Sequence, residues 1–476
     1  MVGMVGCPAT RVSGACSALW WAARAAAHQR PGSHSPRAEH TALSMPAFGA
    51  VTRRAGRCLG SASAVRSSDR PAVLVIAGPT GVGKSEVAEL IASGGGLPRG
   101  VGEIISADSA QVYRGLNVGT AKPTRAEREA VRYHLVDVHP FEKQFHAGDC
   151  VTLGTAAIEE CLARGNTPIV VGGTAFYLRN LIEGLPGTPE TDPTIAAAVS
   201  EKLEGLSWDE GWRQLHKADP IYAAKIRKND WRRLERALNI IEASGRPVSS
   251  FGPGNGDDIL EVPPYDFRCV YLTAPRLNLF ARIDTRCERM VQRGLVEEVV
   301  DLARRGFDQT MPAATAVGYR QTLDYLRHEW LTNRTRTKQR RRRAFLQYLN
   351  VFRAATRQYA RKQTGWFRNR EPRYVWFRQD IDIHGEVQHP ARAAEMICER
   401  FASPLWCEPT ADECSARAHA DRESVAKLKM SGYLPLNVFY DSEDTVDAQL
   451  RSIRAALVES EMLSGEDRGE NDDWGY

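Results

Sequence analysis

Residues 78–85 form a pattern that can bind phosphate. They read Gly78-Pro79-Thr80-Gly81-Val82-Gly83-Lys84-Ser85 and match G-x-x-x-x-G-K-[ST] at every position. The glycines let backbone N–H groups curl around phosphate oxygens, Lys84 supplies a positive charge, and the Ser85 hydroxyl can ligate Mg²⁺. The pattern suits a nucleoside triphosphate, and it suits a diphosphate on another carrier equally well.

Acidic residues near this loop do not follow the usual pattern of an NTPase. Such enzymes hold Mg²⁺ partly through an Asp at the end of a second buried strand. Here the most apolar later run, 168–171, ends in Gly172-Gly173-Thr174, and Asp137 is a weak substitute. Asp108 follows the run 103–107, which places it at the carboxyl edge of the expected sheet, where α/β proteins bind ligands.

Strands alternating with helices must position these residues. Short apolar runs predict strands, and helical spacing follows the phosphate loop and Thr174, so we expect a parallel α/β sheet. The expected strands span 71–77, 103–107, 133–138, 167–171 and 268–273. From 191 to 250 the apolar spacing is helical and no strand pattern appears.

The chain is therefore divided into five parts. We expect a first part of a phosphate-loop α/β core, a helical insertion and, after a Gly- and Pro-rich linker (251–264), a core completion with basic helices. An N-terminal leader precedes them, and a C-terminal extension with an acidic, disordered end follows. The leader spans 1–70, the first part of the core 71–190 and the helical insertion 191–250. The core completion spans 265–375 and the C-terminal extension 376–476.

Positive charge is concentrated in two segments. Residues 1–70 contain nine Arg and two acids, whereas the whole chain has a net charge of +5. An Arg-, Ala- and Ser-rich, acid-poor leader is typical of a mitochondrial or plastid transit peptide. A disordered extension, or a cytoplasmic protein that starts at Met45, is the alternative.

Residues 334–370 contain 13 Lys or Arg and no acid, with Phe345, Leu349, Phe352 and Tyr359 on one helical face. This pattern predicts an RNA-binding helix.

Composition excludes several classes of protein. With 43% apolar and 25% charged residues in 476, the chain is not collagen-like, mainly disordered or a disulfide scaffold. Its longest apolar runs are the length of a strand, so we expect no membrane span.

The motifs together resemble the tRNA dimethylallyltransferases (tRNA isopentenyltransferases), and the bacterial or organelle-type branch in particular. The resemblance covers about residues 71–370 and follows the family's motif order. Beyond the phosphate loop and Val171–Thr174, it rests on Asp108–Gly115, Gly119-Thr120-Ala121-Lys122-Pro123, Asn229–Ala237, Val317-Gly318-Tyr319-Arg320-Gln321, Arg361-Lys362-Gln363 and Trp366-Phe367-Arg368.

The resemblance implies transfer of a dimethylallyl group from dimethylallyl diphosphate to N6 of adenosine 37 in tRNA, with release of diphosphate. Residues 78–85 would then hold the diphosphate with Mg²⁺ on Ser85, and Asp108 would be the general base. Thr80 and an arginine clamp, Arg233 or Arg236, would assist catalysis. The resemblance and the charge of the basic helix together give the expected contacts with the tRNA anticodon stem-loop: Asp108, Ser109, Ala110, Gln111, Thr174, Arg232, Arg233, Arg236, Gly318, Tyr319, Arg320, Arg340, Arg343, Arg361, Lys362, Gln363, Trp366 and Arg368.

Three other functions compete with this interpretation. An adenylate isopentenyltransferase, acting on AMP, ADP or ATP in cytokinin synthesis, would share the fold, but the acid-free basic helix favours tRNA. A phosphate-loop kinase or NTPase is less favoured, and a non-catalytic RNA-binding protein least of all. We expect a monomer with no membrane partner.

Overall fold

The computed structural model describes residues 70–462, apart from 95, 186, 190–191, 252–263, 333–336, 383, 405, 407–409, 426–432, 434 and 436. The expected leader lies outside the described residues except for Arg70, as do most of the expected linker and residues 463–476 of the acidic end.

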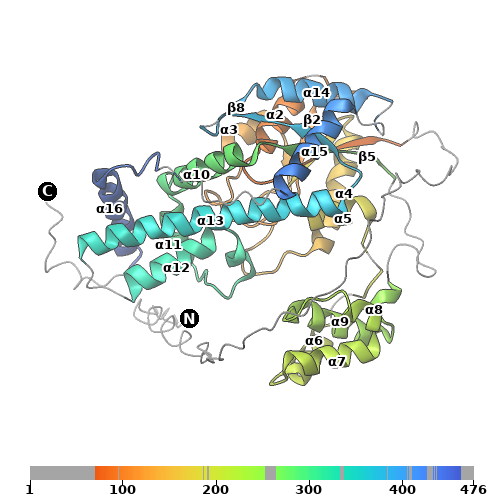
Figure 1. The fold of residues 1–476 in the computed structure, drawn as a ribbon, viewed down its shortest axis with the longest axis horizontal. Helices are drawn as coiled ribbons and strands as arrows, with labels where there is room; N and C mark the ends of the chain where they lie inside the picture. Colours follow the sequence, from red (N-terminus) through yellow and green to blue (C-terminus); the bar gives the residue numbers. More distant parts are fainter. Residues whose placement is uncertain are drawn as a thin grey trace, which may run out of the picture.

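The main body contains a six-stranded sheet in the order β3-β2-β4-β1-β5-β6. Helices surround this sheet (Figure 1). Every neighbouring pair in it is parallel, and β2 and β4 are buried along their whole length. Near-continuous apolar runs are what a parallel sheet covered on both faces requires. The predicted α/β fold is confirmed. The strands are β1 (Ala72–Ala77), β2 (Gly102–Ser106), β3 (Tyr133–His134), β4 (Thr167–Gly172), β5 (Asp266–Thr273) and β6 (Val375–Arg378).

Helices cover this sheet, and most of its strands are separated by helices along the chain. Within the described residues, none of the helices is both long and apolar enough to cross a bilayer. The helices of the main body are α2 (Lys84–Ser93), α3 (Arg125–Ala130), α4 (Ala147–Ala163), α5 (Ala175–Glu183), α10 (Arg276–Gln292), α11 (Leu295–Arg304), α12 (Tyr319–Leu326), α13 (Lys338–Arg370), α14 (Pro390–Ala402), α15 (Ala411–Val425) and α16 (Glu443–Glu459).

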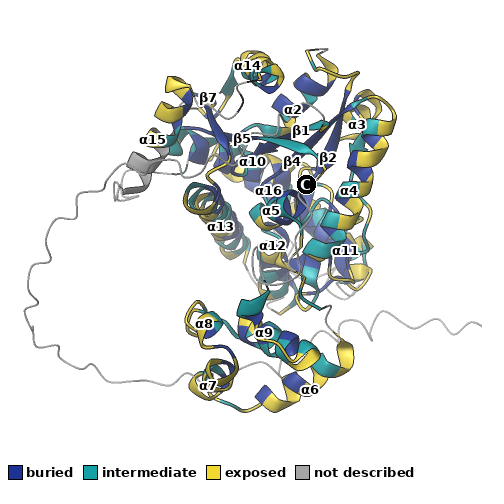
Figure 2. Ribbon diagram, turned by 90° about the vertical axis from the view of Figure 1, so that its right-hand side faces the viewer, coloured by how far each residue is buried: buried dark blue, intermediate teal, exposed yellow. Residues whose placement is uncertain are grey.

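Residues 192–251 form a separate group of helices with a hydrophobic core of their own. Val199, Leu215, Leu234 and Ile240 are buried in this second core, against which Trp208, Trp212 and Trp231 pack. The group lies apart from the sheet in both views (Figures 1 and 2). Its elements are α6 (Pro193–Leu203), α7 (Trp208–Ala218), α8 (Pro220–Ala223), α9 (Trp231–Ser244) and η3 (Val248–Ser250).

The C-terminal part differs from the expected separate extension with a disordered end. The boundary after residue 375 falls inside β6, which pairs with β5 and completes the sheet. Beyond it, α14 packs on α2, α15 on β6, and α16 on α11 and α13. Residues 456–459 of the expected disordered end form the last turn of α16, because Leu450, Ile453 and Leu457 give this helix a buried apolar face.

Candidate active site

Loops after three strands surround one cavity at the carboxyl edge of the sheet. The loop after β1 and the start of α2 contribute Thr80, Gly81, Gly83, Lys84 and Ser85. The loop after β2 contributes Asp108 and Gln111, and Gly172 at the end of β4 is followed by Gly173. The cavity has a volume of about 460 Å³. A second cavity of about 690 Å³ adjoins it and shares Ala121–Thr124, Arg282, Arg286 and Arg293.

The phosphate loop leads directly into α2. Gly81 has φ +83°, and a Cβ at this position would lie 2.9 Å from Ile283 Cγ1 of α10, so only glycine lets α10 approach so closely. Lys84 Nζ donates to the Pro79 carbonyl at 2.9 Å. Burial and, to a smaller extent, the positive charge of Arg286 lower the Lys84 pKa to about 8, against the opposing charge of Asp108. The loop and the N-terminus of α2 together suit a phosphate group.

Arginines on α10 line this cavity, and no motif in the sequence predicted them. Arg286 Nη1 donates to Thr80 Oγ1 at 2.8 Å, which fixes the guanidinium beside the phosphate loop. Burial lowers the Arg286 pKa, an effect of removing its charge from water. Arg282 also lines both cavities. On sequence alone, the two arginines lie four residues apart on an Arg-rich helix, with no adjacent motif to distinguish them.

The structure places the expected arginine clamp away from the phosphate loop. Arg233 and Arg236 lie on α9 of the helical insertion, and neither lines the cavity that contains the phosphate loop. Arg233 pairs with Asp230 at 3.4 Å, and Arg236 Nη2 donates to the Pro189 carbonyl at 3.0 Å. In this arrangement, the positions suited to a diphosphate clamp belong to Arg282 and Arg286.

Asp108 keeps one oxygen available for chemistry. Its Oδ1 accepts from the backbone N–H groups of Ala110 at 2.9 Å and Gln111 at 3.3 Å. Within the part of the chain that the structure describes, Oδ2 makes no hydrogen bond. The backbone N–H of the next residue, Ser109, donates to Thr174 Oγ1 at 3.1 Å. These bonds fix the carboxylate at the wall of the cavity.

Gln363 joins the phosphate loop to the loop after β4. Its Oε1 accepts from the Thr80 N–H at 2.9 Å, and its Nε2 donates to the Gly173 carbonyl at 2.9 Å. The side chain is buried, so the expected tRNA contact at Gln363 is replaced by a role inside the cavity wall. Tyr359 lies one turn earlier on α13 and lines the cavity, although the sequence pattern placed it on the apolar face. Burial, assisted by the charge of Asp108, raises the Tyr359 pKa to about 12.

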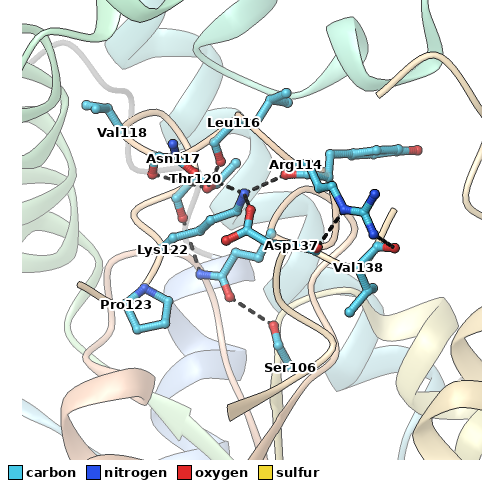
Figure 3. A network of polar contacts seen from close by, with 12 residues as sticks. Ser106, Arg114, Leu116, Asn117, Val118, Thr120, Lys122, Pro123, Asp137 and Val138 are labelled. Carbon is cyan, nitrogen blue, oxygen red and sulfur yellow. Dashed lines mark hydrogen bonds and ion pairs between the residues drawn. The ribbon is translucent and has the colours of Figure 1, made fainter. Parts of the chain in front are cut away.

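The Gly119–Pro123 loop is held by a buried lysine (Figure 3). Lys122 Nζ donates to Asn117 Oδ1 at 3.2 Å, to the Tyr113 carbonyl and to Asp137. Asp137 also pairs with Arg128 at 2.8 Å and does not line the phosphate-loop cavity, so it does not substitute for the missing metal-binding Asp. Gln111 Nε2 donates to the Thr120 and Ala121 carbonyls at 3.3 Å, and therefore Gln111 supports this loop rather than offering a free amide to tRNA.

Comparison with known proteins agrees with this geometry. The IPP transferase family matches residues 111–370. A tRNA dimethylallyltransferase of Protochlamydia amoebophila (strain UWE25) is 36% identical over 318 residues, which cover 66% of this chain and 85% of that protein. The chain belongs to the IPP transferase family. In Arabidopsis thaliana, tRNA dimethylallyltransferase 9 is 33% identical over 429 residues, which cover 83% of this chain and 89% of that one.

A solved structure of this family supports the fold. It shows a eukaryotic dimethylallyltransferase acting on tRNA, and it is similar to this chain with a TM-score of 0.54 and 26% sequence identity. The similarity covers 65% of this chain and 74% of that one.

The residues of this IPP transferase that are expected to contact tRNA differ in how exposed their side chains are. Gly318 and Tyr319 are buried: Tyr319 Oη donates to Glu298 at 2.6 Å and accepts from the Gly119 N–H at 3.1 Å, which corrects their assignment to tRNA. Trp366 and Arg368 are half-buried at the end of α13. The remaining basic side chains expected at tRNA are exposed, apart from half-buried Arg236: Arg232, Arg233, Arg320, Arg340, Arg343, Arg361 and Lys362.

Other arginines of α13 are neutralised by acids from distant elements. Arg353 pairs with Glu288, Arg357 with Asp284 at 2.6 Å, and Arg342 with Asp447 and Glu443. The helix therefore presents less positive charge at its surface than the absence of acids within 334–370 suggested. The three arginines instead fasten α13 to α10 and α16.

Proposed function

We propose that this protein transfers a dimethylallyl group from dimethylallyl diphosphate to N6 of adenosine 37 in tRNA and releases diphosphate. The observation that carries the proposal is the convergence of the phosphate loop, Asp108 and two α10 arginines on one cavity, in a chain of this family.

Asp108 suits the nucleophilic half of the reaction. The exocyclic amine of adenine is a poor nucleophile, since its lone pair is delocalised into the ring. Asp108 Oδ2 is free to accept an N6 proton while the new N6–C1 bond forms, and the bonds to Oδ1 keep the carboxylate oriented.

The other side of the cavity suits the diphosphate leaving group. When the C1–O bond of dimethylallyl diphosphate breaks, its electron pair adds negative charge to the diphosphate. Lys84, Arg282 and Arg286 surround that position with positive charge, fixed in place before reaction, which lowers the barrier. Thr80 assists indirectly, because its hydroxyl and N–H bind Arg286 and Gln363.

Mg²⁺ fits this site through a small set of protein oxygens. Ser85 is exposed on the first turn of α2 and lines the cavity. The described residues contain no group of three or more His, Cys, Asp or Glu that could hold a metal ion. The Ser85 hydroxyl would therefore hold Mg²⁺ together with diphosphate oxygens and water, as is usual for this ion. Bound Mg²⁺ would supply further positive charge beside the leaving group.

The exposed cations suit tRNA as the acceptor rather than a free nucleotide. Arg340, Arg343, Arg361 and Lys362 are exposed on α13, and backbone phosphates are the natural partners of such a row. The target adenine must leave the stacked anticodon loop to reach Asp108, at a cost of a few kcal/mol. Binding along α13 can offset that cost.

The deciding experiment uses labelled dimethylallyl diphosphate, Mg²⁺ and either unmodified tRNA or AMP. Label is expected to enter tRNA and not AMP. Label entering AMP alone would establish the adenylate isopentenyltransferase, and hydrolysis of ATP without prenyl transfer would establish an NTPase. Asp108→Asn should abolish transfer while diphosphate binding, measured by calorimetry, survives. Loss of both would give Asp108 a structural role.

We further propose that the protein works as a monomer in a mitochondrion or plastid. The acid-poor composition of residues 1–70 supports import. Imaging a fluorescent fusion of residues 1–70 tests this, and a diffuse cytoplasmic signal would contradict it.

A further inference from the structure

A small hairpin beyond the family match forms part of the arginine-lined cavity. Strands β7 (Asp380–Ile381) and β8 (Val387–Gln388) pair antiparallel, and the Gly385 and Glu386 between them line the larger cavity beside Arg282 and Arg286. The family match ends at residue 370, so none of its motifs assigns this hairpin a role.

The hairpin contacts Arg282 directly. Arg282 Nη1 donates to the Gly385 carbonyl at 3.0 Å, and the same guanidinium lies 3.9 Å from Glu386 and 3.6 Å from Glu86. Glu386 also pairs with Arg289, two helical turns further along this face, at 3.3 Å. The hairpin thus supplies the nearest acceptor to an arginine that the proposed function assigns to the diphosphate.

Two further features make this contact rigid. Asp382 Oδ1 accepts from the Glu386 N–H at 2.9 Å, and the Asp382 N–H donates to the Glu386 carbonyl at 3.0 Å, so the turn is closed on itself. At the base of the hairpin, Asn278 Nδ2 of α10 donates to the Ile381 carbonyl at 2.6 Å.

Gly385 approaches α10 as closely as a backbone can. It has φ +84°, and a Cβ there would lie 2.4 Å from the backbone nitrogen of Arg282 and 2.6 Å from its Cα. A residue with a side chain would have to move the hairpin away from α10, and the Gly385 carbonyl would leave the guanidinium.

We propose that the β7–β8 hairpin is a positioning element that holds the Arg282 guanidinium in the orientation that binds the diphosphate. This rests on the proposed function of the site. A planar guanidinium binds diphosphate oxygens through two parallel N–H groups only when its plane is set correctly. The Gly385 carbonyl sets that plane by accepting a hydrogen bond from Arg282 Nη1.

A double-mutant cycle between Gly385→Ala and Arg282→Lys tests the proposal. Lysine keeps the charge but has no plane to orient, so the hairpin should matter only when Arg282 is present. In the wild-type background, Gly385→Ala is expected to raise the KM for dimethylallyl diphosphate about tenfold, with an unchanged KM for tRNA. In the Arg282→Lys background, the same change should alter that KM less than about twofold.

Equal effects of Gly385→Ala in the two backgrounds would overturn the proposal, because a general loss of structure does not depend on residue 282. If Gly385→Ala fails to fold, Asn278→Ala loosens the base of the hairpin and enters the same cycle with the same expectations. Glu395→Gln, an exposed charge removal on α14, is the matched control and should leave both KM values unchanged.

Failure of the underlying function gives a different result. If the wild-type protein transfers no label to tRNA, the proposed reaction fails. If Arg282→Lys alone has the wild-type KM for dimethylallyl diphosphate, the hairpin proposal is overturned while the reaction stands.

Discussion

Replacing Gln363 by leucine tests whether the cavity depends on the link between its two loops. Leucine has a similar volume but removes both hydrogen bonds, the one from the Thr80 N–H and the one to the Gly173 carbonyl. The residue is 6% exposed, so water replaces these bonds poorly. Each buried polar group left without a partner costs about 1–3 kcal/mol. Because Thr80 borders the cavity and regains some water, we expect a total loss of about 2–4 kcal/mol of unfolding free energy.

The effect on activity should be separable from the effect of lost stability. Without Gln363, the phosphate loop that carries Lys84 is no longer fixed relative to the loop after β4. A shift of about 1 Å in a catalytic group costs roughly 100-fold in rate, which equals about 2.7 kcal/mol of transition-state stabilisation. We therefore expect kcat/KM for dimethylallyl diphosphate to fall about 100-fold in a tRNA prenylation assay, at a temperature where the variant is fully folded.

Two companion variants sharpen this test. Gln363→Glu retains an acceptor for the Thr80 N–H but loses the donor to Gly173, and it should lie between wild type and leucine. Gln358→Leu removes an exposed glutamine from the same helix and should change neither quantity. If Gln363→Leu matched Gln358→Leu in urea unfolding and in kcat/KM, the link between the loops would have no functional importance.

Three further predictions concern charge. Because burial lowers the pKa of Lys84 to about 8, the ammonium is lost above that pH, and kcat/KM for dimethylallyl diphosphate should fall about tenfold per pH unit there. Lys84→Arg should remove this fall, and a variant whose pH profile is parallel to that of the wild type would contradict the prediction. Replacing Arg340 and Arg343 by alanine should weaken tRNA binding and reduce the slope of log Kd against log salt by about 1.5; an unchanged slope would place the tRNA elsewhere. Lys122→Met leaves Asp137 with one cationic partner and should cost about 3 kcal/mol in urea unfolding, whereas an unchanged midpoint would disprove a structural role.

Local patterns predicted β1, β2, β4 and β5, the phosphate loop and the position of Asp108. They missed β6, and the strand expected over 133–138 is only Tyr133–His134. Each correctly predicted feature depends on residues within a few positions of one another, such as the apolar run Ala72–Ala77 followed directly by the glycines of the loop. Such short-range signals survive in a single sequence because the same residues make both the element and its turn.

Contacts between distant segments could not be predicted in the same way. Gln363 and Thr80 are 283 residues apart, and nothing in either neighbourhood indicates the other. The arginines of α13 showed a similar limit: the pattern counted Arg353 as exposed charge, but Glu288 on α10 neutralises it. Charge along a helix predicts its surface only after the partners from other elements are known.

The order of the sheet has a consequence for the synthesis of this protein on the ribosome. Strand β1 pairs with β4 on one side and with β5 on the other, and the helical group with its own core is encoded between those two neighbours. At typical rates of elongation, roughly 10–40 s separate the emergence of β1 from that of β5. During this interval, one edge of the central strand has no partner, while the intervening helices can already complete their own core. The nascent chain therefore exposes an apolar strand edge that chaperones are expected to bind until β5 arrives.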